Sequence, residues 1–211
     1  MKCILWGALS VLGWAEPASA QFGRIGIKAG ACLTTLVGPG TPVPPKISPL
    51  LGGVAGVYRS IGLGAGGRWA LQPELLYSQQ GHRLSNVSTG YAATLRSHYV
   101  CLPVLLTFAH RGFFGEVGPQ VGYLVGVREE YRIPSPAVVG ITKRVNTSPA
   151  GLPRWDGAGV AGLGYRWTGG VGLEVRYAGS FTGVYANRSG RTKARPRHAA
   201  LQVLASFPLH R

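Results

Sequence analysis

The stretch LQPELLYSQQG, residues 71–81, places a glutamate inside a run of mostly apolar residues. With a period of two, Leu71, Leu75 and Tyr77 fall on one face, whereas Glu74 falls on the other. Such alternation predicts a β-strand with an apolar side and a polar side. The fold and the function therefore depend on what each side of this strand touches.

The first twenty residues have the pattern of a secretory signal peptide. Lys2 supplies the positive start, Ile4 to Trp14 form an apolar centre, and Ala18-Ser19-Ala20 is a small-residue cleavage site. The sequence therefore predicts a signal peptide over 1–20 and one exported domain over 21–211, a length that suits a single domain.

The composition is unusual for a soluble domain. Only 14% of the residues are charged, 33 are glycines and 45% are hydrophobic, and that hydrophobic share argues against disorder. The net charge is +15, which favours anionic partners such as nucleic acid or the phosphates of a membrane surface. Export and the lack of any nucleic-acid-binding motif exclude nucleic acid as a partner.

Cysteines and histidines give no sign of a metal or cofactor site. Once the signal peptide is removed, Cys32 and Cys101 remain. An oxidising compartment permits a disulfide between them, but two buried free thiols are favoured. The five histidines are scattered and match no ligand spacing, so we expect no metal and no cofactor.

Short alternating segments recur along the chain, separated by connections rich in glycine, proline and serine. We expect eight strands, over Phe22–Leu33, Leu50–Ser60, Leu71–Gly81, Tyr99–Phe108, Phe113–Val125, Asp156–Trp167, Val171–Tyr177 and His198–Phe207. The connections alternate between short ones, near 62–67, 109–112 and 168–170, and long polar ones, near 34–48, 81–94, 128–154 and 179–196. This plan predicts an all-β fold, an eight-stranded antiparallel up-and-down transmembrane β-barrel with short periplasmic turns and long external loops.

Charged residues on the polar faces are expected to fill the barrel lumen. They are Arg24, Lys28, Glu74, Glu116, Glu174 and Arg176. Pairing between them offsets much of the cost of burying charge in a narrow tube. A two-residue turn at His110-Arg111 places Leu105 opposite Glu116, and the later turn places Gly162 opposite Arg176, where a glycine leaves room for the large side chain.

The segments LQPELLYSQQG, YVCLPVLLTF, GFFGEVGPQVGYLVG and GVAGLGYRWTGGVGLEVRYAGSFTGV together resemble the outer-membrane β-barrel domain of Bacteroidota, the group that includes PorT-like proteins. The resemblance covers about residues 22–207. It implies a small eight-stranded barrel in the outer membrane of a Gram-negative bacterium. Most members of the group have no assigned activity.

A basic run near the C-terminus is the best candidate for an interaction site. It contains Arg188, Arg191, Lys193, Arg195 and Arg197 and lies in the last external loop. The long connection before it adds Arg132, Lys143, Arg144 and Arg154. These residues favour contact with outer-membrane lipids through lipopolysaccharide phosphates, or with an unknown protein partner, although such runs are also typical of solvated loops.

Three classes of function follow. The leading interpretation is a barrel with a side-chain-filled lumen and a structural or surface-interaction role. The second is a small transport pore, although eight strands leave an interior wide enough only for side chains. The third is a lipid-modifying enzyme built on His82, Ser85 and His98, but no acidic residue lies between Gly81 and Ala109 to orient a base, so we expect no enzymatic activity.

Overall fold

The structure is a computed structural model that describes residues 24–38, 46–64, 67–86, 91–135, 140–147, 153–183 and 196–209. The predicted signal peptide and its cleavage site lie outside the described residues. Among the described residues, no helix has the length and hydropathy needed to span a membrane.

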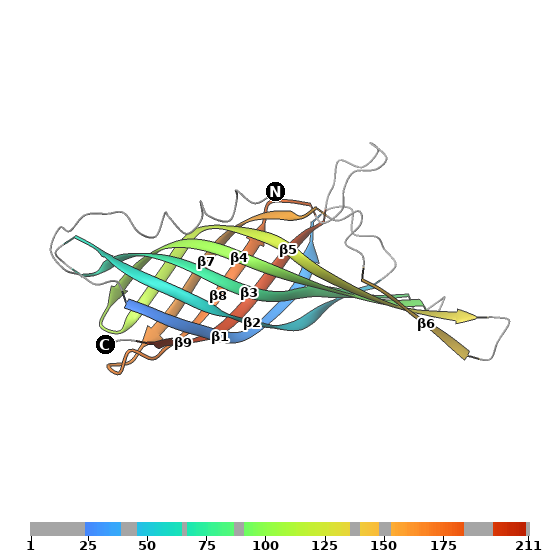
Figure 1. Ribbon diagram of the computed structural model, residues 1–211, viewed down its shortest axis with the longest axis horizontal. Coiled ribbons are helices and arrows are strands. Elements are labelled where there is room, and N and C mark those ends of the chain that lie inside the picture. Colours follow the sequence, from blue (N-terminus) through green and yellow to red (C-terminus); the bar gives the residue numbers. More distant parts are fainter. Residues whose placement is uncertain are drawn as a thin grey trace, which may run out of the picture.

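The described residues form nine strands joined in one antiparallel sheet (Figure 1). The strands are β1 (Arg24–Val37), β2 (Lys46–Leu63), β3 (Trp69–Asn86), β4 (Tyr91–His110), β5 (Phe113–Ser135), β6 (Gly140–Asn146), β7 (Trp155–Arg166), β8 (Gly172–Ser180) and β9 (Arg197–Pro208). Pairing of β4 with β5 closes a ring that contains every strand except β6. The predicted eight-stranded antiparallel barrel is therefore confirmed.

The two faces of the barrel wall differ as the alternation predicts. Along β8, residues from Gly172 to Ser180 alternate strictly, with Glu174 and Arg176 buried and Leu173 and Val175 exposed. Apolar side chains thus cover the outside, and the charged and polar side chains of these strands are buried inside together with some apolar ones. This is the arrangement of a membrane barrel and the inverse of a soluble one.

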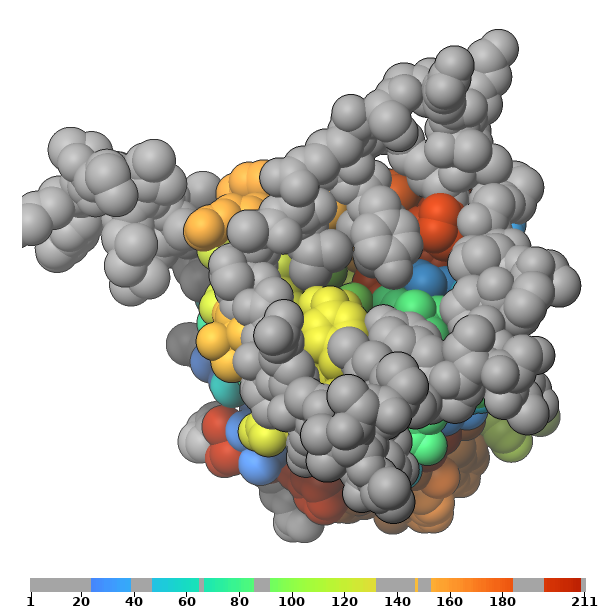
Figure 2. Space-filling model, turned by 90° about the vertical axis from the view of Figure 1, so that its right-hand side faces the viewer, coloured from blue at the N-terminus to red at the C-terminus, as the bar shows by residue number. Residues whose placement is uncertain are grey.

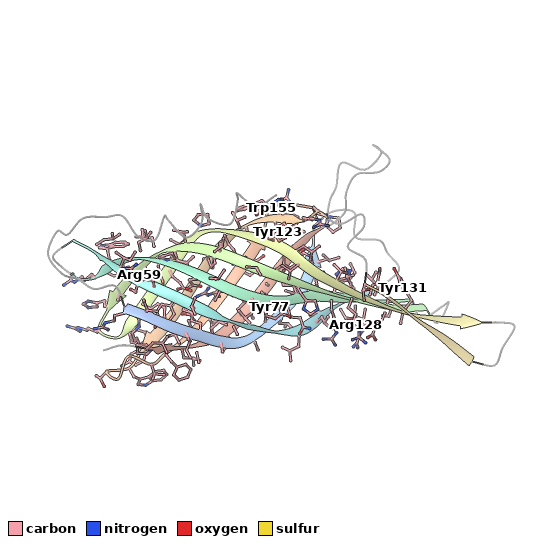
Figure 3. All side chains as sticks on the ribbon, viewed as in Figure 1. Arg59, Tyr77, Tyr123, Arg128, Tyr131 and Trp155 are labelled. Carbon is pink, nitrogen blue, oxygen red and sulfur yellow. The ribbon has the colours of Figure 1, made fainter. Side chains whose placement is uncertain are left out.

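Two belts of aromatic side chains border the apolar outer surface. The belt at the end with the short turns consists of Trp69, Phe108, Phe113, Tyr165, Trp167 and Phe207. The other belt consists of Tyr77, Tyr123, Trp155 and Phe181. Figure 3 shows Tyr77, Tyr123 and Trp155 at a similar level along the barrel. Such belts mark the two membrane–water interfaces of outer-membrane barrels.

The turn between β4 and β5 differs from the prediction by two residues in register. It lies at Arg111-Gly112, where both residues have positive φ, at 51° and 89°, as a tight hairpin turn requires. Glu116 therefore pairs with Thr107 and not with Leu105. Because a shift of two keeps every side chain on its face, the assignment of inside and outside is unaffected. The predicted pairing of Gly162 with Arg176 is confirmed.

The connection over 128–154, predicted as a loop, contains regular structure. β5 continues to Ser135 and pairs with β6, which lies outside the ring. Figure 1 shows this β5–β6 hairpin projecting far beyond the barrel, and Figure 2 views the molecule from that end, with yellow atoms of β5 near the centre. The short turns, the start of β1 and the end of β9 all lie at the opposite end of the barrel. That end is therefore periplasmic and the hairpin is external.

Prolines inside strands interrupt the ladders locally. Between β3 and β4, pairing stops after Pro73–Val104 and resumes at Leu76–Cys101. Between β4 and β5, it stops at Pro103–Gln120 and resumes at Leu106–Val117. The barrel thus accommodates residues that lack a backbone donor by leaving short gaps beside them.

Candidate functional site

The interior of the barrel holds a cluster of five charged side chains from four strands. They are Lys28 on β1, Glu74 on β3, Glu116 on β5, and Glu174 and Arg176 on β8. In the ring order, β1 lies opposite β5 and β3 lies opposite β8. The cluster therefore crosses the lumen along two diameters, and we call it the ionic cluster.

Arg176 is the central cation of the ionic cluster. Its guanidinium donates to both carboxylate oxygens of Glu74, Nη1 to Oε2 at 2.8 Å and Nη2 to Oε1 at 3.2 Å. It also donates to Glu174 on its own strand. A bidentate arginine–carboxylate pair is both strong and fixed in geometry. Arg176 therefore links β8 to β3 on the opposite side of the barrel.

Lys28 is the second cation and joins the same carboxylates from β1. Its Nζ lies 2.7 Å from Glu74 Oε1 and 2.7 Å from Glu174 Oε1. Nζ also lies 5.3 Å from the centre of the Tyr58 ring on β2. Gln72 adds a hydrogen bond from Nε2 to Glu74 Oε1 at 2.8 Å. Glu74 is thus bound by two cations and one amide.

Glu116 is the least firmly held member of the ionic cluster. Arg176 Nε lies 3.0 Å from Glu116 Oε1, and Lys28 Nζ lies 3.9 Å from Oε2. The first contact does not have the geometry of a hydrogen bond and the second is too long for one, so both carboxylate oxygens lack a hydrogen-bond partner among the described residues. Two cations face three carboxylates, and Glu116 is the carboxylate left with the weakest pairing.

The ionic cluster is completely withdrawn from solvent. The five side chains are at most 1% exposed. Leu76, Leu105 and Leu204 point into the same lumen and are equally buried, and Leu204 is the cross-strand partner of Glu174. Cys32 and Cys101 are buried there as free thiols. Side chains therefore close the barrel interior at this level.

Of the six residues predicted to form the lumen network, the structure brings five together in the ionic cluster and places Arg24 outside it. Arg24 has the same parity on β1 as Lys28, but it is the first residue of the strand and its side chain is exposed at the periplasmic end. An odd or even residue number within a strand shows which face a side chain is on, but it does not show how far along the barrel the residue lies. Tyr58 and Gln72 were missed; the even-numbered position of Gln72, two residues before Glu74, was the available signal.

The basic residues predicted to bind anionic partners are only partly described. Arg188, Arg191, Lys193 and Arg195 lie outside the described residues, whereas Arg197 begins β9 and is exposed. Three residues of the earlier connection lie in the β5–β6 hairpin, namely Arg132, Lys143 and Arg144. Arg154 is exposed and donates from Nη1 to the hydroxyl of Tyr123 at 3.2 Å.

The residues considered for catalysis are not assembled. The side chain of His82 is buried in the lumen beside His198, with ring centres 6.3 Å apart. His98 lies on the outer face, where its Nδ1 is 2.5 Å from the Tyr77 hydroxyl. The barrel wall thus separates the two histidines. Within the described segments, no group of three or more His, Cys, Asp or Glu side chains is placed to hold a metal ion.

Comparison with known protein families agrees with this geometry. Residues 21–186 match the model of the family described as outer membrane protein beta-barrel domain. The chain belongs to this family. Membership implies that the protein resides in the outer membrane, with the apolar outer face of the barrel in contact with lipid. The comparison with curated proteins finds no relative.

Several solved structures are similar to this chain at low sequence identity. Neisserial surface protein A is 12% identical with a TM-score of 0.50, over 88% of this chain and 97% of that one. The Ail protein of Yersinia pestis, solved with a heparin analogue, is 13% identical with a TM-score of 0.43, over 88% and 99%. The N-terminal barrel of Pseudomonas aeruginosa OprF is 14% identical with a TM-score of 0.38, over 88% and 99%.

Proposed function

We propose that this protein is a sealed outer-membrane barrel with a structural or surface-interaction role that it performs through its external loops. The ionic cluster carries this proposal, because it joins opposite walls of the barrel along two diameters and is fully buried. A channel for solutes would need an open path at this level, and an eight-stranded ring has room for side chains only.

The external end is the part that can meet a partner. The β5–β6 hairpin extends beyond the barrel and carries several cations, among them Arg132 and Lys143, which are cross-strand partners. The predicted contact residues for anionic lipids or a protein partner are Arg188, Arg191, Lys193, Arg195 and Arg197. A projecting hairpin with a positive charge is a surface suited to an anionic partner.

Catalysis is not part of the proposed function. A triad needs its nucleophile and base within hydrogen-bond reach, and the base must be oriented by a third group. His82 and His98 lie on opposite faces of the wall, which argues against a shared site.

We also propose two finer assignments that rest on sequence motifs. One is a place among the Bacteroidota barrels that include PorT-like proteins, supported by segments such as LQPELLYSQQG. The other is cleavage of the signal peptide after Ala20, supported by the Ala18-Ser19-Ala20 motif.

Planar-bilayer recording tests whether the barrel is sealed. The purified, refolded protein is expected to produce no discrete conductance steps, because the ionic cluster and the leucines around it fill the lumen. A general porin reconstituted in the same bilayers serves as the positive control. Reproducible steps at a fixed conductance, from protein that has passed a folding assay, would show that the lumen is open.

A further inference from the structure

Three arginines lie on the outer wall just beyond the external aromatic belt. Tyr77, Val100 and Tyr123 are at one level on β3, β4 and β5. Arg96 precedes Val100 by four residues on β4, towards the external end, and is the cross-strand partner of Arg128. At about 3.3 Å per residue and a tilt of about 40°, these arginines stand about 10 Å beyond the belt, at the depth of lipid head groups.

A β-bulge turns Arg128 outward. His98 pairs with Gly126 and Tyr99 with Leu124, so Val125 is an extra residue in β5. Before the bulge, even-numbered residues of β5 such as Glu116 face the lumen. After it, Val127 is buried and Arg128 is exposed on the outer face. Bulges commonly re-aim a side chain in this way.

The third arginine lies on the adjacent strand. Arg83 on β3 is exposed and pairs with Thr94, two residues beyond Arg96 on β4. Figure 3 shows Arg128 at the base of the projecting hairpin, further along the barrel than Tyr77, whereas Arg59 lies at the opposite end. Arg83, Arg96 and Arg128 therefore occupy neighbouring positions on one side of the wall, and we call them the wall arginines.

Among the described residues, the charges of the wall arginines are balanced only in part. Like charges directly opposite each other on neighbouring strands are destabilising, and Arg96 and Arg128 stand in that relation. Arg128 has one counterion, with its Nε 3.0 Å from Glu130 Oε1. Within the part of the chain that the structure describes, Arg83 and Arg96 form no ion pair. A bound anion would relieve this repulsion.

We infer that the wall arginines bind the phosphate groups of a phosphorylated glycolipid of the outer leaflet. Guanidinium groups bind phosphate oxygens through paired hydrogen bonds. The site continues the lipid-facing surface directly, so a lipid whose acyl chains lie on the apolar wall places its phosphates within reach of these arginines. The inference rests on the proposed function in one respect, since it requires the barrel to span the outer membrane.

The test measures binding of lipid A to the folded protein in zwitterionic detergent micelles. The wild type is expected to bind lipid A carrying both phosphates and to bind dephosphorylated lipid A at least about tenfold more weakly. The double variant Arg96→Gln/Arg128→Gln is expected to lose at least about tenfold in affinity for the phosphorylated lipid. Heat-dependent gel mobility establishes that each variant is folded.

The matched control removes the same charge from the periplasmic end. In Arg24→Gln/Arg68→Gln, two exposed arginines are replaced and affinity is expected to stay within about twofold of wild type. Equal binding of both lipids, unchanged affinity in the wall variant, or an equal loss in the control would each overturn the inference. None of these outcomes would contradict a sealed lumen. Conductance steps in the planar bilayer would contradict a sealed lumen, but they would not contradict the lipid site.

Discussion

Arg176→Met is expected to lower the free energy of unfolding by about 3–5 kcal/mol, because it leaves three buried carboxylates with Lys28 as their one cation. Methionine replaces the aliphatic part of the arginine side chain and carries no charge, so the loss reports mainly the missing ion pairs. Urea titration of the barrel folded into lipid vesicles measures the change. An unfolding free energy equal to that of wild type would show that Arg176 is not paired inside the lumen.

Two further variants separate charge from packing. Arg128→Met removes an arginine whose ion pair is exposed, with side chains 55% and 30% accessible, and should cost about 1 kcal/mol or less. Adding Glu116→Gln to Arg176→Met removes one of the excess negative charges and should restore part of the stability. If adding Glu116→Gln lowers the free energy of unfolding further instead, the surplus of carboxylates is not what destabilises the Arg176→Met variant.

Gly56→Ala is expected to destabilise the barrel by about 1–3 kcal/mol, towards the upper end of that range. Gly56 lies on β2 between Lys28 of β1 and Leu76 of β3. A Cβ at this position would overlap the carbonyl oxygen of Leu75 and stand 2.8 Å from the Cα of Leu76. Both atoms belong to a paired strand, so the neighbour cannot move aside without breaking the ladder.

Gly53→Ala is the control on the same strand. A Cβ at Gly53 would meet no atom within 4 Å, and alanine is favoured over glycine in a strand interior by about 0.5–1 kcal/mol. The two substitutions are therefore expected to change the unfolding free energy in opposite directions. Equal effects in the vesicle titration would show that the close approach of β2 and β3 is not a constraint.

Alternation of apolar and polar residues was sufficient to predict the wall of the barrel. In the stretch around Glu74, every second residue faces lipid. The hydrocarbon interior of the membrane requires these residues to be apolar, and this requirement is visible in the sequence. The extension of β5 and the strand β6 were missed for the same reason. They project beyond the part of the barrel that spans the membrane, where contact with lipid no longer requires alternation.

The pairing inside the lumen was predictable only in part. The positions of Lys28 and Arg176 on inward faces follow from parity, but their partners lie across the barrel, up to 146 residues away along the chain. Which charges meet depends on ring closure and on the register of each hairpin, and the predicted β4–β5 turn was two residues out of register. Arg24 was wrongly included because parity carries no information on depth.

The orientation of the barrel wall is tested most directly by the gel mobility of the outer-membrane fraction, unboiled and boiled. An apolar outside and a closed hydrogen-bonded ring should resist detergent until heated, so the protein is expected in the outer-membrane fraction with a band that shifts on boiling. A protein that is soluble in the periplasm and never shifts would contradict the account, because the face bearing Leu75 would then point inward and Glu74 would lie on the surface.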